Sequence, residues 1–101
     1  MLTDKELDEK LEQSPAPRVT KQSMEERIKK TGFVRLTPTV TICNILLDNG
    51  YSVRGESACV NLENYNQEIG ERVAYDNAFD KLWPLFGFLL AETQYQKGDK
   101  Q

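Results

Sequence analysis

The chain has 101 residues, a hydrophobic fraction of 39% and a formal net charge of −3. This composition fits one small domain with a thin core, and no apolar run approaches the roughly 18–20 residues that span a bilayer. The chain starts with acidic and polar residues rather than a signal peptide, so we expect a cytoplasmic protein without a membrane segment. It has no histidine, which removes the commonest general base and the commonest zinc ligand.

Residues 1–17 are predicted to form a flexible or marginally helical N-terminal arm. Thr3 and Glu6 have the spacing of a capping box, so a short helix is expected over residues 3–13. A helix this short is marginal in water. The arm therefore either stays solvated or docks Leu2, Leu7 and Leu11 on a second subunit or a partner. Prolines at 15 and 17 end this element, and the folded domain is predicted to cover residues 18–95, followed by a polar tail at 96–101.

A second helix is predicted over residues 20–31. Thr20 is a good N-cap, Met24 and Ile28 form an apolar stripe, and Gly32 suits the left-handed position that follows a helix. Residues 33–36 are then expected to form a short extended segment, which Pro38 closes.

A β-hairpin is predicted around Asn49-Gly50, because this dipeptide between β-rich runs is typical of a two-residue turn. With both residues in the turn, the numbers of paired residues sum to 99. One face then carries Val40, Ile42, Leu46 and Val53, and we expect that face to pack against the helices. In the same register Cys43 and Cys59 point to opposite faces, which excludes a disulfide between them.

The other face of this predicted hairpin is the candidate binding or interface site. It carries an apolar strip with two charged residues, namely Cys43, Ile45, Leu47, Arg54 and Glu56. A two-stranded ribbon with an apolar back and open edges is not stable alone. We therefore expect a homodimer, or a third strand from residues 33–36 that covers one edge. Arg54 and Glu56 either pair across a subunit interface, bind a ligand, or form an exposed ion pair of little energetic worth.

A long C-terminal helix is predicted to start after Asn61. Its apolar stripe is expected at Leu62, Tyr65, Ile69 and Val73 and to continue toward Trp83. Gly70 lies within the helix and suits a close approach to the hairpin. Pro84 predicts a kink near residues 81–85, and residues 85–90 are predicted to form a last buried segment.

The motifs that could carry chemistry favour a non-enzymatic protein. Gly55–Cys59 lies where a nucleophile elbow would lie, but it lacks the second glycine and the chain has no histidine base. The acidic residues of the long helix are spread around its circumference, so we expect a solvated face rather than a metal site. No cofactor is expected.

The segment from Leu47 to Leu90 resembles a family of small phage and prophage proteins, the phage gene 49/gene 66 family, whose biochemical function is uncharacterised. The matching residues are Asn49-Gly50, Val53, Gly55–Val60, Asn64, Glu68–Gly70, Ala74, Asn77-Ala78, Leu82-Trp83, Leu85, Gly87 and Leu89-Leu90. The likeness covers roughly residues 18–95 and departs at Phe86, where family members often have an acidic residue. It implies a phage or prophage origin and action in the bacterial cytoplasm.

We therefore expect an α+β domain of order helix, hairpin, helix, with the helices on one face of a small antiparallel sheet. The predicted function is that of a non-enzymatic phage accessory protein, which binds a host or phage macromolecule as a homo-oligomer. One alternative is a protein that sequesters a nucleotide-like signal between subunits, near Arg54, Glu56 and the basic residues Lys29, Lys30 and Arg35. A nucleic-acid binder is a second alternative, which the net charge disfavours.

Overall fold

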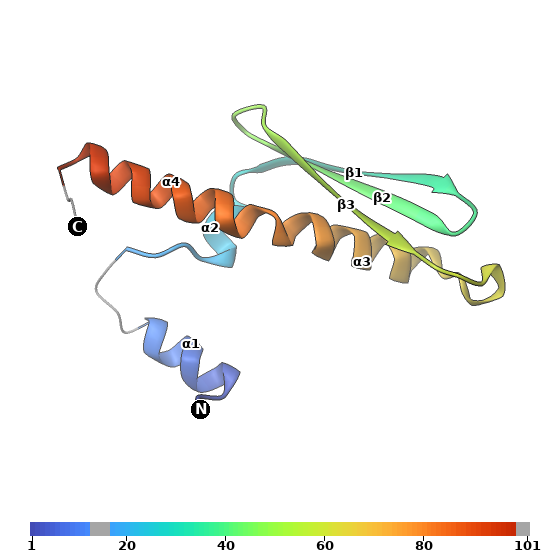
Figure 1. Cartoon of the computed structure of the whole chain (residues 1–101), viewed down its shortest axis with the longest axis horizontal. Coiled ribbons are helices and arrows are strands. Elements are labelled where there is room, and N and C mark those ends of the chain that lie inside the picture. The colour runs from blue at the N-terminus through green and yellow to red at the C-terminus, as the bar shows by residue number, and fades with distance from the viewer. Residues whose placement is uncertain (13–16, 99–101) are drawn as a thin grey trace.

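The computed structural model describes residues 1–12 and 17–98, apart from the side chains of residues 11, 12 and 62 (Figure 1). Pro15, one of the two prolines predicted to end the N-terminal element, therefore lies outside the described residues. In chain order, the elements are α1 (Asp4–Glu12), α2 (Lys21–Glu25), β1 (Ile28–Thr37), β2 (Val40–Leu47), β3 (Ser52–Ala58), the 3₁₀ turn η1 (Leu62–Asn64), α3 (Gln67–Asp80) and α4 (Leu82–Gln96).

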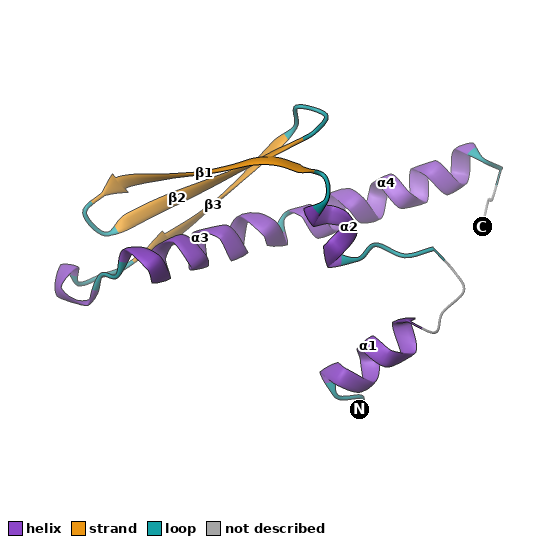
Figure 2. Cartoon of the chain, turned by 180° about the vertical axis from the view of Figure 1, so that it is seen from behind, coloured by secondary structure: helices purple, strands orange, loops and turns teal. Residues whose placement is uncertain are grey.

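The three strands form one antiparallel sheet in the order β1-β2-β3. Helix α3 packs across β2 and β3, and α4 continues from it beyond the sheet (Figures 1 and 2). This confirms the predicted α+β fold, with a bent C-terminal helix on one sheet face. The expected third strand is also confirmed, because β1 contains residues 33–36 and pairs with β2 along one edge of the hairpin.

The helix predicted over residues 20–31 is wrong beyond its first turn. Thr20 caps α2 as predicted, since its Oγ1 accepts a hydrogen bond of 3.0 Å from the Ser23 backbone nitrogen. The helix ends at Glu25, however, and Gly32 lies within β1 opposite Asn44. The β-branched and aromatic residues after Arg27 fit a strand paired with β2, and this tertiary pairing outweighs their helical spacing.

The predicted hairpin register is wrong by one residue. The turn contains three residues, Asp48, Asn49 and Gly50, because the Leu47 nitrogen donates to the Tyr51 carbonyl oxygen at 2.8 Å. Only Gly50 takes a positive φ, +92°, whereas a two-residue turn would require a positive φ at Asn49 as well. This shift moves the side chains of β2 to the other face relative to those of β3, whereas Val53 of β3 is buried as predicted. Thr41, Cys43, Ile45 and Leu47 are consequently buried against the helices, where the sequence predicted Val40, Ile42 and Leu46.

The cysteines are both free, but for a different reason from the one predicted. In the observed register they lie on the same side of the sheet and are separated along it. Cys43 is paired with Gly55, whereas the Cys59 nitrogen donates to the Thr39 carbonyl oxygen.

Helix α3 lies on the sheet through small residues. Gly70, Ala74 and Ala78 are buried, whereas the predicted stripe residue Ile69 is 63% exposed and Val73 is also exposed. The helix begins after Asn66, whose Oδ1 accepts from the Ile69 nitrogen at 3.2 Å, and not after Asn61. The close approach predicted at Gly70 is confirmed, because an added Cβ would lie 3.3 Å from Thr41 Oγ1.

The predicted kink is confirmed at Lys81, which ends α3 and precedes the first residue of α4. The predicted burial of residues 85–90 is wrong for this chain alone. Leu85, Phe88 and Leu89 are exposed, because α4 extends past the sheet that would cover them (Figure 1).

Helix α1 forms with the predicted cap. The Glu6 nitrogen donates to Thr3 Oγ1 at 3.2 Å, and the Glu6 carboxylate accepts in return from the Thr3 hydroxyl at 3.0 Å. Leu2 and Leu7 are exposed, so the leucines of the arm that the structure describes are free for solvent or for another surface.

Candidate interaction surface

The five predicted site residues do not lie on one surface. Cys43, Ile45 and Leu47 belong to the core and are 0%, 0% and 4% exposed, respectively. Arg54 and Glu56 are exposed on the opposite face, since Gly55 between them is the residue that pairs with Cys43. The apolar strip that was predicted to need a partner is therefore covered by α3 of the same chain.

Burial also changes the chemistry of Cys43. The low-polarity surroundings raise the pKa of its thiol by disfavouring the thiolate. Cys43 is therefore a small apolar core residue rather than part of a binding surface.

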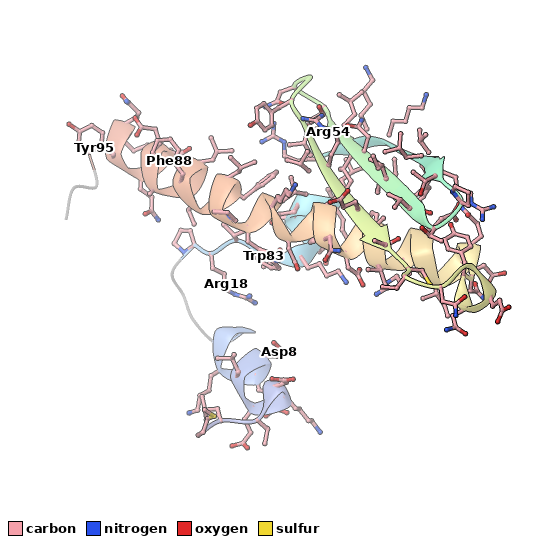
Figure 3. The ribbon with its side chains drawn as sticks, turned by 45° about the vertical axis from the view of Figure 1, so that its right-hand side comes forward. Asp8, Arg18, Arg54, Trp83, Phe88 and Tyr95 are labelled. Atoms are coloured by element: carbon pink, nitrogen blue, oxygen red, sulfur yellow. The ribbon has the colours of Figure 1, made fainter. Side chains whose placement is uncertain are left out.

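The face of the sheet away from the helices is the surface on which Arg54 and Glu56 lie. Val34 and Ile42 are paired across β1 and β2 on this open face, which also carries Leu46. Arg54 does not pair with Glu56; its Nη1 donates to Ser52 Oγ at 2.9 Å and to Asn44 Oδ1 at 3.2 Å. Figure 3 shows Arg54 on the sheet, well apart from Phe88 on α4. A binding role for Arg54 and Glu56 stays a prediction, now on a different face from Cys43.

Helix α4 supplies the larger unpartnered apolar surface. Its first ten residues, 82–91, include no charged side chain, and Phe88 is 69% exposed. Trp83, Leu85 and Leu89 are also exposed, with Trp83 edge-on to Phe79 at 6.3 Å between ring centroids. A helix that is apolar on all sides is normally buried. The apolar character of this segment would normally require burial, but α4 of the single chain leaves Leu85, Phe88 and Leu89 exposed.

A groove of about 290 Å³ lies between α4 and the turn that joins β2 to β3. It is lined by Arg27, Leu47, Asn49, Tyr51, Leu85, Phe86, Phe88 and Leu89. The groove is therefore walled by apolar side chains of α4 on one side and by the hairpin tip on the other.

Arg27 is the charged residue of this groove, and its charge is already matched. Its Nη2 lies 2.9 Å from Asp48 Oδ1, and its guanidinium carbon lies 5.6 Å from the centre of the Phe86 ring. The hydrogen bond from Arg27 lowers the pKa of Asp48 and raises that of Arg27 itself. An apolar occupant thus fits this groove better than an anion does.

A second cavity, of about 220 Å³, lies beside Ser57, Tyr65 and the start of α3. The hydroxyl groups here join elements together. Ser57 Oγ donates to the Gly70 carbonyl oxygen at 2.8 Å, and Tyr65 Oη lies 2.6 Å from Thr41 Oγ1. Ser57 therefore fastens α3 to β3, which accounts for a serine at the end of this strand.

The acidic residues of α3 do not gather into a cluster. In residues 1–12 and 17–98, no three His, Cys, Asp or Glu side chains lie close enough together to hold a metal ion. Asp76, for example, pairs with Arg72 at 3.0 Å on the helix surface. Across the same described ranges, no helix combines the length and the apolar character needed to cross a membrane.

A three-stranded sheet with one covered face and an apolar helix that extends beyond it defines a small α+β protein with an unpartnered surface. The chain belongs to the Phage protein (N4 Gp49/phage Sf6 gene 66) family, whose model matches residues 18–94. This confirms the family resemblance and its extent. No curated protein and no solved structure matches the chain.

Proposed function

We propose that this phage protein is a non-enzymatic accessory protein that assembles as a homo-oligomer, most simply a dimer, and binds a host or phage macromolecule in the bacterial cytoplasm. The observation that carries the proposal is the exposed apolar surface of α4. Leu85, Phe88 and Leu89 are exposed and form one wall of the apolar groove.

The size of the exposed surface supports association. A compact monomer of this mass, 11.6 kDa, exposes about 5,800 Å², whereas this chain exposes 7711 Å². Its radius of gyration is 17.1 Å, against about 13 Å for a compact domain of 100 residues. The arm that carries α1 contributes part of this excess. A typical stable interface needs about 800 Å² from each partner, so enough surface is exposed for one.

A second copy of the chain is the occupant that we propose for this groove, because its own α4 offers an apolar surface that matches the lining. Under a two-fold axis, α4 of each chain enters the groove of the other, and the same residues are buried on both sides. Such an arrangement leaves the open sheet face, with Arg54 and Glu56, available to a further partner.

Size-exclusion chromatography with light scattering tests the assembly. We expect a dimer for the natural chain and a monomer for Phe88→Glu, because a charge buried in an apolar interface is strongly unfavourable. Ile69→Glu is the matched control, since Ile69 is a similarly exposed helical residue, at 63% against 69%, but outside the groove. A natural chain that stays monomeric at about 100 μM, or a Phe88→Glu variant that stays dimeric, would contradict the proposal.

The nucleotide-sequestering alternative depended on a basic cluster of Lys29, Lys30 and Arg35, which are not gathered on one face of the sheet. Lys30 and Arg35 lie on opposite faces of β1, with Leu46 and Thr41 as their respective partners. The Arg35 guanidinium lies 4.4 Å from the Tyr65 ring centre and donates to the Pro38 carbonyl oxygen. We therefore propose macromolecular binding ahead of a nucleotide-like ligand.

A further inference from the structure

The outer edge of β1 has unpaired backbone groups. The Leu47–Tyr51 and Cys59–Thr39 hydrogen bonds show that the odd-numbered residues of β2 bond to β3. In an antiparallel sheet the alternate residues bond to the other neighbour, so the even-numbered residues of β2 bond to Lys30, Gly32 and Val34 of β1. The amide and carbonyl groups of Thr31, Phe33 and Arg35 consequently point away from the sheet.

The opposite edge of the sheet is partly covered. The outward carbonyl oxygen of Glu56 accepts a hydrogen bond of 2.8 Å from Asn77 Nδ2, and that of Arg54 accepts one from Lys81 Nζ. Both donors come from the end of α3, which runs along β3. In the part of the chain that the structure describes, no side chain binds the outward groups of β1 in this way, and the strand forms the outer border of the sheet in Figure 2.

The charge beside the open edge has one sign. Residues 28–47 contain three basic residues and no acidic one, and Arg27, just before this stretch, is paired with Asp48. Lys29 and Lys30 lie at one end of the regularly paired stretch and Arg35 at the other, with Phe33 and Val34 exposed between them. An added strand would therefore meet positive charge near both of its ends and apolar side chains in the middle.

We propose that the outer edge of β1, residues 31–35, binds an extended acidic segment of a partner protein by strand addition. Backbone hydrogen bonds from Thr31, Phe33 and Arg35 supply the affinity, and the flanking basic side chains select acidic residues. This inference rests on the proposed function, for which it names the binding site and the class of partner. A second copy of β1 fits this edge less well, because it would bring the same basic side chains to it.

A synthetic peptide provides the test. The probe is a capped, fluorescent eight-residue peptide of sequence Asp-Glu-Val-Thr-Val-Thr-Glu-Asp, titrated with the full chain and followed by anisotropy. Thr31→Pro removes one outward amide and leaves the pairing with β2 intact, since a proline is tolerated where its nitrogen faces away from the sheet. We expect this change to weaken binding by about tenfold or more. The control Thr31→Val keeps the amide and should stay within about twofold. Lys29→Glu with Lys30→Glu should weaken binding by about tenfold.

A second measurement does not depend on any variant. Amide hydrogen exchange of the natural chain should be fast at Thr31, Phe33 and Arg35 and should slow when the peptide is added. No binding of the peptide at 1 mM, or binding without protection of these amides, would overturn strand addition. If charge reversal weakens binding but Thr31→Pro does not, the edge attracts acidic ligands, nucleic acid included, by charge alone, and the proposal is wrong.

These outcomes are separate from those for the proposed assembly. If the chain is dimeric through α4 but does not bind the peptide, the proposed assembly is supported and the strand-addition proposal is wrong. If the chain is monomeric but the peptide protects the β1 amides, strand addition is supported and the proposed assembly is wrong.

Discussion

Gly55 of β3 and Ala78 of α3 lie so close together that a Cβ added to Gly55 would be 2.2 Å from the Ala78 backbone nitrogen. The same added atom would lie 2.6 Å from the Ala74 carbonyl oxygen. The helix therefore rests directly on the strand at this point, and both neighbours are backbone atoms that cannot rotate aside.

Gly55→Ala should consequently destabilise the protein by at least about 2 kcal/mol, because α3 must move off the sheet to admit one methyl group. For a chain of this size, that corresponds to a fall in melting temperature of about 10 °C. Urea denaturation followed by circular dichroism measures the free energy of unfolding.

Gly87→Ala is the control for this change. Apart from its chain neighbours and the adjacent turns of its own helix backbone, no atom of the described residues lies within 4 Å of a Cβ built at Gly87, which is in α4. Alanine there should stabilise the helix by up to about 1 kcal/mol. A Gly55→Ala variant within 0.5 kcal/mol of the natural chain would contradict the close packing.

The ion pair of Arg27 and Asp48 predicts a dependence of stability on pH. The hydrogen bond from Arg27 lowers the pKa of Asp48 below its ordinary value of 3.8. Because the folded-state pKa is the lower one, the stabilisation is present above about pH 4 and is lost as the pH falls through the folded-state value. Between these pH values the unfolded chain binds more protons at Asp48 than the folded chain does.

Asp48→Asn should therefore flatten the acid limb of the stability profile while leaving the other carboxylates in place. Urea midpoints measured from pH 2 to pH 7 for the two chains give this comparison. Parallel profiles would show that the pair contributes nothing to acid sensitivity. The pair is exposed to solvent, so 1 M salt should reduce the difference.

The two cysteines should differ in reactivity. Cys43 is completely buried with a raised thiol pKa, whereas Cys59 is partly exposed and its Sγ donates to the Asn61 carbonyl oxygen at 3.0 Å. A thiol reagent at pH 8 should modify Cys59 first and Cys43 at least about a hundredfold more slowly, because Cys43 reacts only when the core opens.

Mass spectrometry of the time course counts the modified thiols, and Cys59→Ser identifies the slow one. Equal rates at the two sites would mean that the sheet opens readily at β2. In urea above the unfolding midpoint the difference between the two rates should disappear.

The fold class could be predicted from the sequence, but the face that β2 turns toward the helices could not. Asn49-Gly50 located the turn correctly, and what decides the register is whether Asp48 joins it. Asp48 does so because its backbone nitrogen donates to the Arg27 carbonyl oxygen at 2.9 Å and its side chain pairs with Arg27. Because Arg27 is 21 residues away in the sequence, this contact could not be predicted from local turn preferences.

The prediction of which α3 residues face the sheet was wrong for a related reason. Two asparagines, Asn61 and Asn66, are both good N-caps, and the choice between them determines which residues meet the sheet. A pattern search favours the large residues Ile69 and Val73. The sheet instead accepts Gly70, Ala74 and Ala78, because its contact with α3 at Gly55 leaves no room for large side chains.

The candidate surface on α4 was visible in the sequence as an apolar segment, and only its burial was mistaken. An apolar composition indicates that a helical segment is normally buried against other protein surface. The composition does not indicate whether the burying surface belongs to the same chain. Here α4 extends beyond the sheet before its apolar residues end (Figure 3).

Lys81 links two properties of this protein that would otherwise be independent. It is the residue at which the long helix bends, and its ammonium group binds the Arg54 carbonyl oxygen at the border of β3. The direction of α4 is thus tied to the hydrogen bond that covers this carbonyl group of β3. A movement that swung α4 to a new angle would pull Lys81 away and leave the strand open to pairing. A change in the angle between α3 and α4 would therefore expose a carbonyl group of β3 to pairing with another chain, which favours a single rigid geometry of the bent helix.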